Sequence, residues 1–390
     1  MAKPKIRFKG YTDDWEQRKF GDLGSVAMCK RIFKEQTSTD GDIPFYKIGT
    51  FGAEPDAFIS RELFEEYRGK FQYPNIGDML ISASGTIGRT VEYKGEEAYF
   101  QDSNIVWFKH DDRVDNSFLK CIYEIVKWSG IEGSTIKRLY NDNFLKTEFS
   151  MPKVAEQQQI GMYFQSLDHL ITLHQRKCEQ TKKMKKYMLQ KMFPQNGAKV
   201  PEIRFDGFTY DWEQRKFSEL YARSSEKNDG SIGMDKNITV ATMQFKNDVK
   251  VSTTEYLKTY YTFKLGDIAF EGHQSKEFRY GRFVENDIGN GIVSHIFAVF
   301  RPIQEYDLYF WKYAINNETL MQRILARSTK ASTMMHDLVT NDFLNETFLV
   351  PSVKEQKQIG AFLNKLDNLI TLHQRQTDFY KKISFYYISS

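Results

Sequence analysis

The residues best suited to catalysis are an acidic side chain and a nearby Glu-x-Lys motif. Asp78 is followed by Glu92-Tyr93-Lys94, and such groups can bind Mg²⁺ and orient a water molecule for hydrolysis. An ordinary charged hairpin explains the same residues. A second copy of the pattern keeps Asp267 and Glu285 but has Asp287 where the lysine would be. A duplicated catalytic site should keep its lysine, so we interpret the chain as non-catalytic, with a Mg²⁺-dependent nuclease as an alternative.

Motifs of several enzyme classes are absent from the sequence. There is no GxxxxGK[ST] phosphate loop, no GxGxxG opening a βαβ unit and no GxSxG nucleophile elbow. The Asn-Pro-Pro-aromatic or Asp-Pro-Pro-aromatic tetrapeptide that holds an exocyclic amine for methyl transfer is also missing. We therefore expect no cofactor to be bound by this chain.

Two polar loops offer groups that contact phosphates and base edges. GDMLISASGTIGR (77–89) and GDIAFEGHQSKEFRYGR (266–282) share an opening Gly-Asp and a closing Gly-Arg, which predicts a strand leading into a loop that returns at a glycine. Hydroxyl, amide and guanidinium groups there suit nucleic-acid recognition, although a solvated turn is the alternative. The candidates are Ser82, Ser84, Thr86 and Arg89 in the first loop and His273, Gln274, Ser275, Lys276, Arg279 and Arg282 in the second.

Two further polar clusters have the same ambiguity. One precedes an apolar strand and consists of Gln101, Ser103 and Asn104, matched roughly by Ser294 and His295. The other consists of Lys137, Arg138 and Tyr140 in one copy and Arg327, Lys330 and His336 in the other. The basic residues could bind along a phosphate backbone. The structural alternatives are that the first cluster completes the hydrogen bonds at the end of a strand and that the second is the solvated end of a helix.

The segments that must position these loops occur twice in the sequence. DWEQRKF occurs at 14–20 and 211–217, and LDxLITLHQR at 167–176 and 366–375. The interiors between these repeats, about 22–140 and 219–338, barely resemble each other, and short Val-, Ile-, Tyr- and Phe-rich runs predict an α+β domain in each half. We therefore expect two equivalent modules of different specificity, related by a pseudo-two-fold repeat.

Each half closes with a long helix. Residues 155–193 and 354–388 contain no proline and one glycine each, and their apolar positions alternate at spacings of four and three, as in a coiled coil. Because the two stripes share one register, we expect the helices to pack against each other. The stripes are Ile160, Phe164, Leu167, Ile171, His174, Cys178, Thr181, Lys185, Met188 and Met192, and Ile359, Leu363, Leu366, Ile370, His373, Thr377, Tyr380, Ser384 and Tyr387.

Two histidines and a run of lysines on these helices have simple structural explanations. His174 and His373 lack a second ligand at i+3 or i+4, so they are expected to set helix register and not to bind metal. Lys182, Lys183, Lys185 and Lys186 are most simply a solvated face, although they could support a phosphate backbone.

Composition limits the class of protein. The net charge is only +4, yet 15% of the residues are aromatic, which fits a surface able to hold a polyanion. The cysteines Cys29, Cys121 and Cys178 show no paired spacing, so we expect a reducing cytoplasm and no disulfide framework. No signal peptide or apolar run of membrane-spanning length is present.

Together these segments resemble the specificity subunit of type I restriction-modification enzymes. The resemblance rests on the repeated WEQRKF segment, the GDxLIS and GTIG strings, the FxxPxxxEQxxIG transition at 149–161 and 348–360, and LDxLITLHQR. It implies two target recognition domains, each reading one part of a split, asymmetric DNA site, with the two long helices packed as an antiparallel coiled coil that acts as the spacer. It also implies partners: two methyltransferase subunits that use S-adenosylmethionine, and restriction subunits that use ATP and Mg²⁺.

The expected domains are 1–152 and 198–351 for target recognition, with spacer helices at 153–197 and 352–390. One departure from the repeat concerns the second helix, which ends KKISFYYISS where the first continues KKMKKYMLQKMFPQ. This divergence predicts weaker docking of one methyltransferase copy. A coiled-coil scaffold with two protein-binding modules is the remaining alternative.

Overall fold

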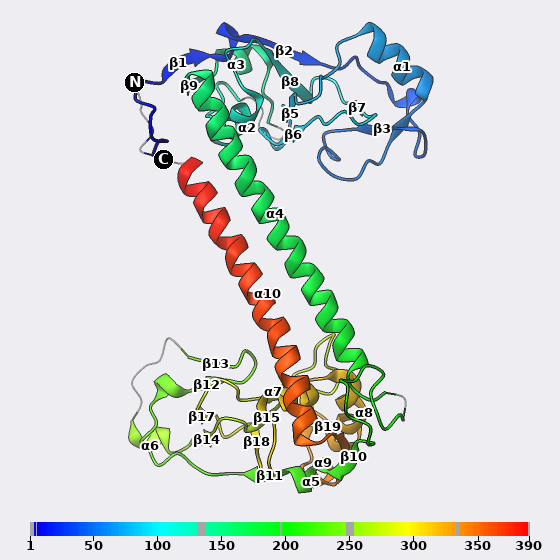
Figure 1. Ribbon diagram of the computed structural model, residues 1–390, viewed down its shortest axis with the longest axis vertical. Coiled ribbons are helices and arrows are strands. Elements are labelled where there is room, and N and C mark those ends of the chain that lie inside the picture. Colours follow the sequence, from blue (N-terminus) through cyan, green and yellow to red (C-terminus); the bar gives the residue numbers. More distant parts are fainter. Residues whose placement is uncertain are drawn as a thin grey trace. The chain divides into compact units, whose positions relative to one another are not determined.

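The computed structural model describes residues 4, 6–131, 137–195, 197–246, 253–332 and 335–388. It divides into unit 1 (Met1–His174 with Arg375–Ser390) and unit 2 (Gln175–Gln374). Two long helices, α4 (Val154–Lys191) and α10 (Val353–Ile388), contribute to both (Figure 1). The predicted α+β class and the two long helices are confirmed, and each helix begins one residue before its predicted start.

Unit 1 is built on a four-stranded antiparallel sheet in the order β2-β8-β5-β6. Its strands are β2 (Gly24–Met28), β8 (Ile105–His110), β5 (Met79–Ser82) and β6 (Thr90–Glu92). Smaller sheets pair β1 (Glu16–Lys19) with β9 (Glu148–Met151), and β4 (Phe58–Ile59) and β7 (Tyr99–Phe100) with β3 (Ile43–Tyr46). The helices are α1 (Arg61–Lys70), α2 (Asn116–Ile125) and α3 (Asn141–Lys146), with 3-10 turns at Phe20–Asp22 and Lys34–Gln36.

Unit 2 repeats this sheet in the order β11-β18-β15-β16. The strands are β11 (Tyr221–Ser224), β18 (Ala298–Pro302), β15 (Ile268–Glu271) and β16 (Arg282–Glu285). The two-stranded sheets pair β10 (Glu213–Lys216) with β21 (Thr347–Val350), β12 (Ile238–Thr239) with β13 (Gln244–Phe245), β14 (Tyr261–Phe263) with β17 (Gly291–Val293), and β19 (Thr329–Ala331) with β20 (His336–Leu338). The helices are α5 (Phe217–Leu220), α6 (Thr254–Leu257), α7 (Leu308–Ile315), α8 (Glu318–Ser328) and α9 (Thr340–Asn345), with a 3-10 turn at Met234–Lys236.

The two inner strands of each central sheet are largely buried on both faces. Successive side chains of a strand point to opposite faces. In β8, Val106 and Phe108 therefore join the core under α2 and α3, whereas Ile105 and Trp107 join a second core against β3 and α1. This double burial explains why the strand is an unbroken apolar run. In unit 2, Phe300 and Val299 of β18 divide in the same way.

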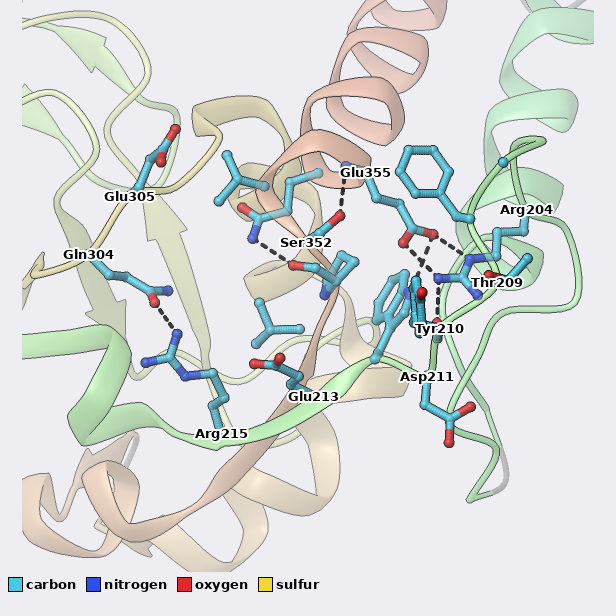
Figure 2. Close-up of a pocket in the computed structure, with 17 residues that line it drawn as sticks. Arg204, Thr209, Tyr210, Asp211, Glu213, Arg215, Gln304, Glu305, Ser352 and Glu355 are labelled. Atoms are coloured by element: carbon cyan, nitrogen blue, oxygen red, sulfur yellow. Dashed lines mark hydrogen bonds and ion pairs between the residues drawn. The ribbon is translucent and has the colours of Figure 1, made fainter.

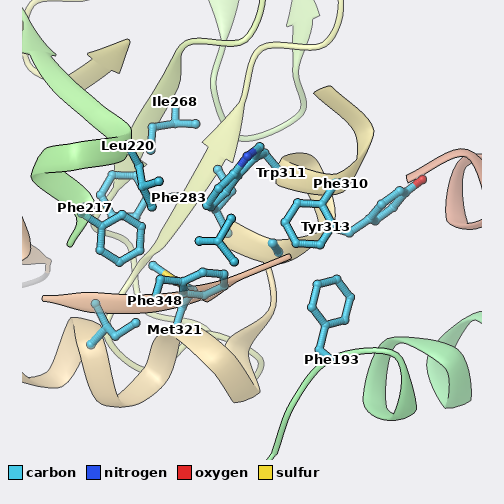
Figure 3. Close-up of a cluster of buried hydrophobic side chains, with 14 of the residues drawn as sticks. Phe193, Phe217, Leu220, Ile268, Phe283, Phe310, Trp311, Tyr313, Met321 and Phe348 are labelled. Carbon is cyan, nitrogen blue, oxygen red and sulfur yellow. The ribbon is translucent and has the colours of Figure 1, made fainter. Parts of the chain in front are cut away.

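The repeated terminal segments pair with each other. The WEQRKF segment forms β1 and β10, and each strand runs antiparallel to the strand just before a long helix, with Arg18 opposite Phe149 and Arg215 opposite Phe348. The next phenylalanine, Phe20, is fully buried and stacks on Phe149 at 4.4 Å between ring centroids. Its counterpart Phe217 belongs to the cluster of buried hydrophobic side chains in Figure 3. In each unit, the first strand therefore pairs with the last strand before the long helix. These paired strands are called the frame below.

A buried ion pair fixes the first turn of each long helix. Arg7 donates Nε and Nη2 to the Glu156 carboxylate at 2.6 and 2.7 Å. Arg204 binds Glu355 in the same bidentate manner at 2.7 and 2.9 Å, and the Trp212 Nε1–H adds a bond to Glu355 at 3.3 Å. Figure 2 shows this second pair at the wall of a cleft of about 400 Å³. Both glutamates are almost fully buried, so each lead segment is held to its helix.

The glutamine after each glutamate ties the long helix to a short one. Gln157 accepts from the Asp115 backbone N–H at 2.9 Å and donates to Arg113 and Pro152 carbonyls. Gln356 likewise accepts from the Asp307 N–H at 3.1 Å. Since Asp115 and Asp307 are the N-caps of α2 and α7, the Glu-Gln dipeptide joins three parts of each unit.

The predicted stripe positions of α4 and α10 are buried or half-buried, except for Tyr387, which is exposed. In unit 1, His174 stacks on Tyr380 and Tyr163 contacts Tyr387. In unit 2, Lys185 pairs with Asp367 at 2.6 Å. Positions rise along α4 as they fall along α10, which confirms antiparallel packing in each unit. One expectation needs refinement, because Ile359, Leu363 and Leu366 pack in the globular core of unit 2.

The single glycine of each long helix lies where a short helix crosses it. A Cβ on Gly161 would lie 1.8 Å from Ser117 Oγ and 2.5 Å from its Cβ, and one on Gly360 would lie 2.6 Å from the Phe310 backbone nitrogen. Contacts this short force atoms apart. Glycine at these positions therefore allows α2 and α7 to approach.

We predict that Gly161→Ala destabilises unit 1 by about 1–3 kcal/mol, the usual cost of overpacking. Thermal or denaturant unfolding of the full chain measures it. Gly69→Ala is the matched control, because a Cβ there meets nothing within 4 Å and alanine favours its helix α1. Equal stability of the two variants would contradict the close crossing.

A buried carboxyl group in unit 2 makes stability depend on pH. Glu285 is 2% exposed, and neither of its carboxyl oxygens has a hydrogen-bond partner in the described part of the chain. Burial raises the pKa of Glu285 well above 4.5, with Asp287 and Asp307 adding to the rise and Lys312 opposing it. The folded state therefore prefers the protonated acid.

Because the folded pKa of Glu285 lies above its unfolded value, its contribution to stability is complete below about pH 4.5 and is lost as pH rises through the folded pKa. We predict that Glu285→Gln gains stability relative to the natural chain as pH rises from 4 to 8. Melting temperatures across that range test this, with exposed Glu213→Gln as the control for loss of one charge. A difference that stays constant with pH would reject the prediction.

Candidate nucleic-acid interface

The three polar clusters predicted in the first half of the chain meet at one edge of the unit 1 sheet. The Ala83 N–H donates to the Asn104 carbonyl at 2.8 Å, and the Gly85 N–H donates to the Lys137 carbonyl at 2.9 Å. Ser84 and Arg138 form a β-bridge. The loop after β5, the turn before β8 and the strand-like segment before α3 are therefore one continuous surface.

The serines of the first loop hold the loop in shape. Ser82 is 2% exposed; its hydroxyl donates to the Thr86 carbonyl and accepts from the Arg89 N–H at 2.9 Å. Ser84 is buried as well. Both side chains are thus directed inward, whereas Thr86 and Arg89 are exposed. Arg89 also donates to the Phe51 carbonyl at 3.0 Å, so its guanidinium is partly fixed.

The turn before β8 holds a second set of polar groups. Gln101 accepts from the Ile48 N–H at 2.9 Å, which directs this side chain toward β3. Asn104 accepts from Arg138 Nη2 at 3.3 Å. Asp102 pairs with Arg31 at 2.8 Å. Lys137, Arg138 and Tyr140 are exposed beside this turn.

Unit 2 places its long polar loop beside the β19-β20 hairpin. The His336 N–H donates to the Gly272 carbonyl at 2.8 Å, and His273 forms a β-bridge with Met335. Lys330 is exposed on the same hairpin. The turn that contains His295 leads into β18, whose Ala298 pairs with Phe270 of β15, so this turn continues past the end of β15. His273, Gln274, Lys276 and His295 are exposed.

Several predicted residues of unit 2 also serve the loop itself. Ser275 Oγ accepts from the Glu277 and Phe278 N–H groups. Arg282 donates to Glu271 at 2.7 Å and to the Ala241 carbonyl at 2.8 Å. The Arg279 side chain is exposed and lies over the Tyr280 ring. Arg327 pairs with Glu346, and His336 is buried. The exposed residues of the loop tip remain the candidates for contact.

One acidic residue of the alternative nuclease site, Asp78, has a structural role. Asp78 accepts from the Asn75 N–H at 2.8 Å, and burial raises the pKa of Asp78. The Lys94 backbone N–H donates to Glu96. Within the described ranges, no three His, Cys, Asp or Glu side chains gather closely enough to hold a metal ion, and no helix is long and apolar enough to cross a membrane.

Sequence reasoning missed Arg31. Its partner Asp102 is 71 positions away in the chain, and no local spacing connects the two. The edge of the sheet brings them together because β2 pairs with β8 from Gly24↔His110 to Met28↔Val106. Only the strand order could have revealed this contact.

Comparison with known proteins gives a family and a fold. The family model described as the type I restriction modification DNA specificity domain matches twice, at residues 12–183 and 210–378. A type I restriction enzyme specificity subunit of Haemophilus influenzae is 58% identical over 156 residues, which are 39% of this chain and 40% of that protein. The match therefore spans less than half of that relative.

A solved structure is similar over nearly the whole length. The crystal structure of the type I restriction-modification system S subunit from M. genitalium covers 99% of this chain and 98% of its own, with a TM-score of 0.61 at 14% identity. At that identity the similarity shows the fold. The double match of the family model is consistent with the two units described above.

Proposed function

Since the chain belongs to the type I restriction modification DNA specificity family, we propose that it is the subunit that selects the DNA sequence for a restriction-modification complex. It performs no chemistry itself. Partner methyltransferase and restriction subunits supply methyl transfer with S-adenosylmethionine, and translocation and cleavage with ATP and Mg²⁺. Because cellular DNA lies in the cytoplasm of a bacterium, we place the complex there.

One observation supports this proposal most strongly. Both units keep the same strand order and the same frame, β2-β8-β5-β6 and β11-β18-β15-β16, yet the loops at the edge of the sheet differ in length and in polar groups. Two modules with the same strands but different polar loops are suited to reading different DNA sequences. The recognised site is then bipartite and asymmetric.

We assign DNA contact to the exposed members of the two edges. In unit 1 these are Thr86, Arg89, Lys137 and Arg138. In unit 2 they are His273, Gln274, Lys276, Arg279, His295 and Lys330. Ser82, Ser84, Gln101 and Arg282 support these edges from within. We place target recognition in residues 1–152 and 198–351, and docking of partner subunits on the helical segments 153–197 and 352–390.

The proposal predicts that exchanging residues 22–140 for those of another family member changes one half of the recognised site. The exchange leaves β1, β9 and α3 in place, so the Phe20–Phe149 contact and the buried ion pair of unit 1 are retained. Methylome sequencing of cells that express the chimera with its methyltransferase subunits identifies the new site.

The reciprocal exchange of residues 219–338 is the control and should change the other half alone. A change of both halves by either chimera would contradict modular reading. Absence of any sequence-dependent methylation with the natural chain would contradict the proposed function itself.

A further inference from the structure

An arginine outside the predicted clusters stands beside the turn at 101–104. Arg31 follows β2, and its side chain is 60% exposed. Its Nε donates to Asp102 Oδ2 at 2.8 Å, and the Asp102 side chain is only 16% exposed. The Nε–H is therefore occupied, and the N–H donors of the two terminal nitrogens remain.

The turn that holds Asp102 is fixed on several sides. The Ile105 N–H donates to the Gln101 carbonyl at 3.1 Å, and the Asn104 carbonyl accepts from Ala83. Ser103 has a φ of 51°, a left-handed conformation that residues other than glycine seldom adopt and that is often found at functional sites. Asp102 is thus presented by a short, constrained turn, which orients the guanidinium of Arg31.

The charge of this pair favours a base over a phosphate. Asp102 compensates the charge of Arg31. Because its carboxylate lies 2.8 Å from Arg31 Nε, it also repels a phosphate oxygen that approaches the guanidinium. The remaining N–H donors still match the two acceptors, O6 and N7, on the major-groove edge of guanine. Arg138 differs, because its partner Asn104 is neutral and no carboxylate pairs with Arg138 among the residues that the structure describes. Arg138 is therefore suited to a phosphate.

Unit 2 has no equivalent of this arginine. Ala27 pairs with Trp107 as Ser224 pairs with Val299, so Asn228 occupies the position of Arg31. Asn228 is 2% exposed, and its Nδ2 donates to the Ile232 and Leu257 carbonyls. It has no access to a ligand. The group at this position thus differs between the two modules.

We propose that Arg31 reads a guanine in the half-site recognised by unit 1, with Asp102 as its positioning residue. This inference rests on the proposed function. It adds a specificity-determining residue and the base that this residue selects.

The test uses the complex with methyltransferase subunits and a duplex that carries the site mapped for the natural chain. Each guanine of the unit 1 half-site is replaced in turn by 7-deazaguanine, which lacks the N7 acceptor. Arg31→Ala should lower the affinity for natural DNA roughly 5- to 150-fold, the range for losing a bidentate base contact. One 7-deazaguanine replacement should lower the affinity of the natural complex by a smaller factor, because it removes one of the two acceptors, and Arg31→Ala should be insensitive to that replacement. Arg31→Lys should not restore recognition, because lysine lacks the planar fork.

Asp102→Asn separates positioning from folding. Asparagine keeps an acceptor for Arg31 but removes the compensating charge. Discrimination at the guanine should fall, while binding to unrelated duplex rises and its salt slope steepens by about one. A purely structural role for Asp102 would leave the salt slope unchanged.

Arg113→Ala is the matched control. Arg113 also pairs with an aspartate, Asp111, at 2.7 Å, but it lies beyond the opposite end of β8. It should retain the response to 7-deazaguanine. Thermal unfolding of each variant establishes that the fold is intact.

Three results would overturn the inference: a unit 1 half-site without guanine, an Arg31→Ala variant that responds to 7-deazaguanine as the natural chain does, or an equal loss on all sequences. A natural complex that prefers no sequence would instead contradict the proposed function. The two failures are therefore distinguishable.

Discussion

The buried Arg–Glu pair at the start of each long helix is the interaction on which the rest of each unit depends. Glu156 and Glu355 are each 1% exposed, and a carboxylate removed from water is tolerated only when it is paired and hydrogen-bonded. Arg7 and Arg204 meet this requirement with bidentate bonds. Each pair joins a lead segment to a helix, and the following glutamine joins the same helix to the N-cap of α2 or α7. The direction in which a long helix leaves its globular part is thereby set by these two constraints at consecutive residues.

This arrangement leaves the edge of the sheet free to change. The strands β1 and β9 pair with each other, as do β10 and β21, and Phe20 and Phe217 are fully buried, so these strand pairs do not include the loops between β5 and β6 or β15 and β16. Unit 2 adds α8 and the β19-β20 hairpin where unit 1 has a shorter connection. The hairpin borders the polar loop, whereas the helix packs in the core through Met321 and Leu325. New surface can therefore be added without disturbing the ion pair.

The sequence predicted the repeat, the class and the long helices because each has a local signature. Periodicity of three and four residues located α4 and α10, and the Gly-Asp and Gly-Arg strings located β5, β15 and their loops. The inward direction of Ser82 could not be predicted, because it depends on the register of a seven-residue loop closed by Arg89. Arg31 and Asp102 could not be connected either, since their contact depends on which strands are neighbours. Likewise, apolar periodicity cannot tell a helix partner from a globular core, and Leu363 and Leu366 face the core.

The repeated aspartate of the LDxL segment shows how the two units diverged while keeping one charge satisfied. In unit 2, Asp367 accepts from Lys185 of α4 and from the Tyr313 hydroxyl. In unit 1 the residue that corresponds to Lys185 is Ser384, and Asp168 instead pairs with Lys120 of α2 at 2.5 Å. The counterpart of Lys120 in unit 2, Lys312, is engaged by Asp287. Each aspartate thus pairs with a lysine, from α4 in unit 2 and from α2 in unit 1. Although α10 has a serine where α4 has Lys185, the Asp168 carboxylate therefore still has a cationic partner. Two possible partners for one repeated charge allow the helix end to differ between the units while the short helix still packs against the long one.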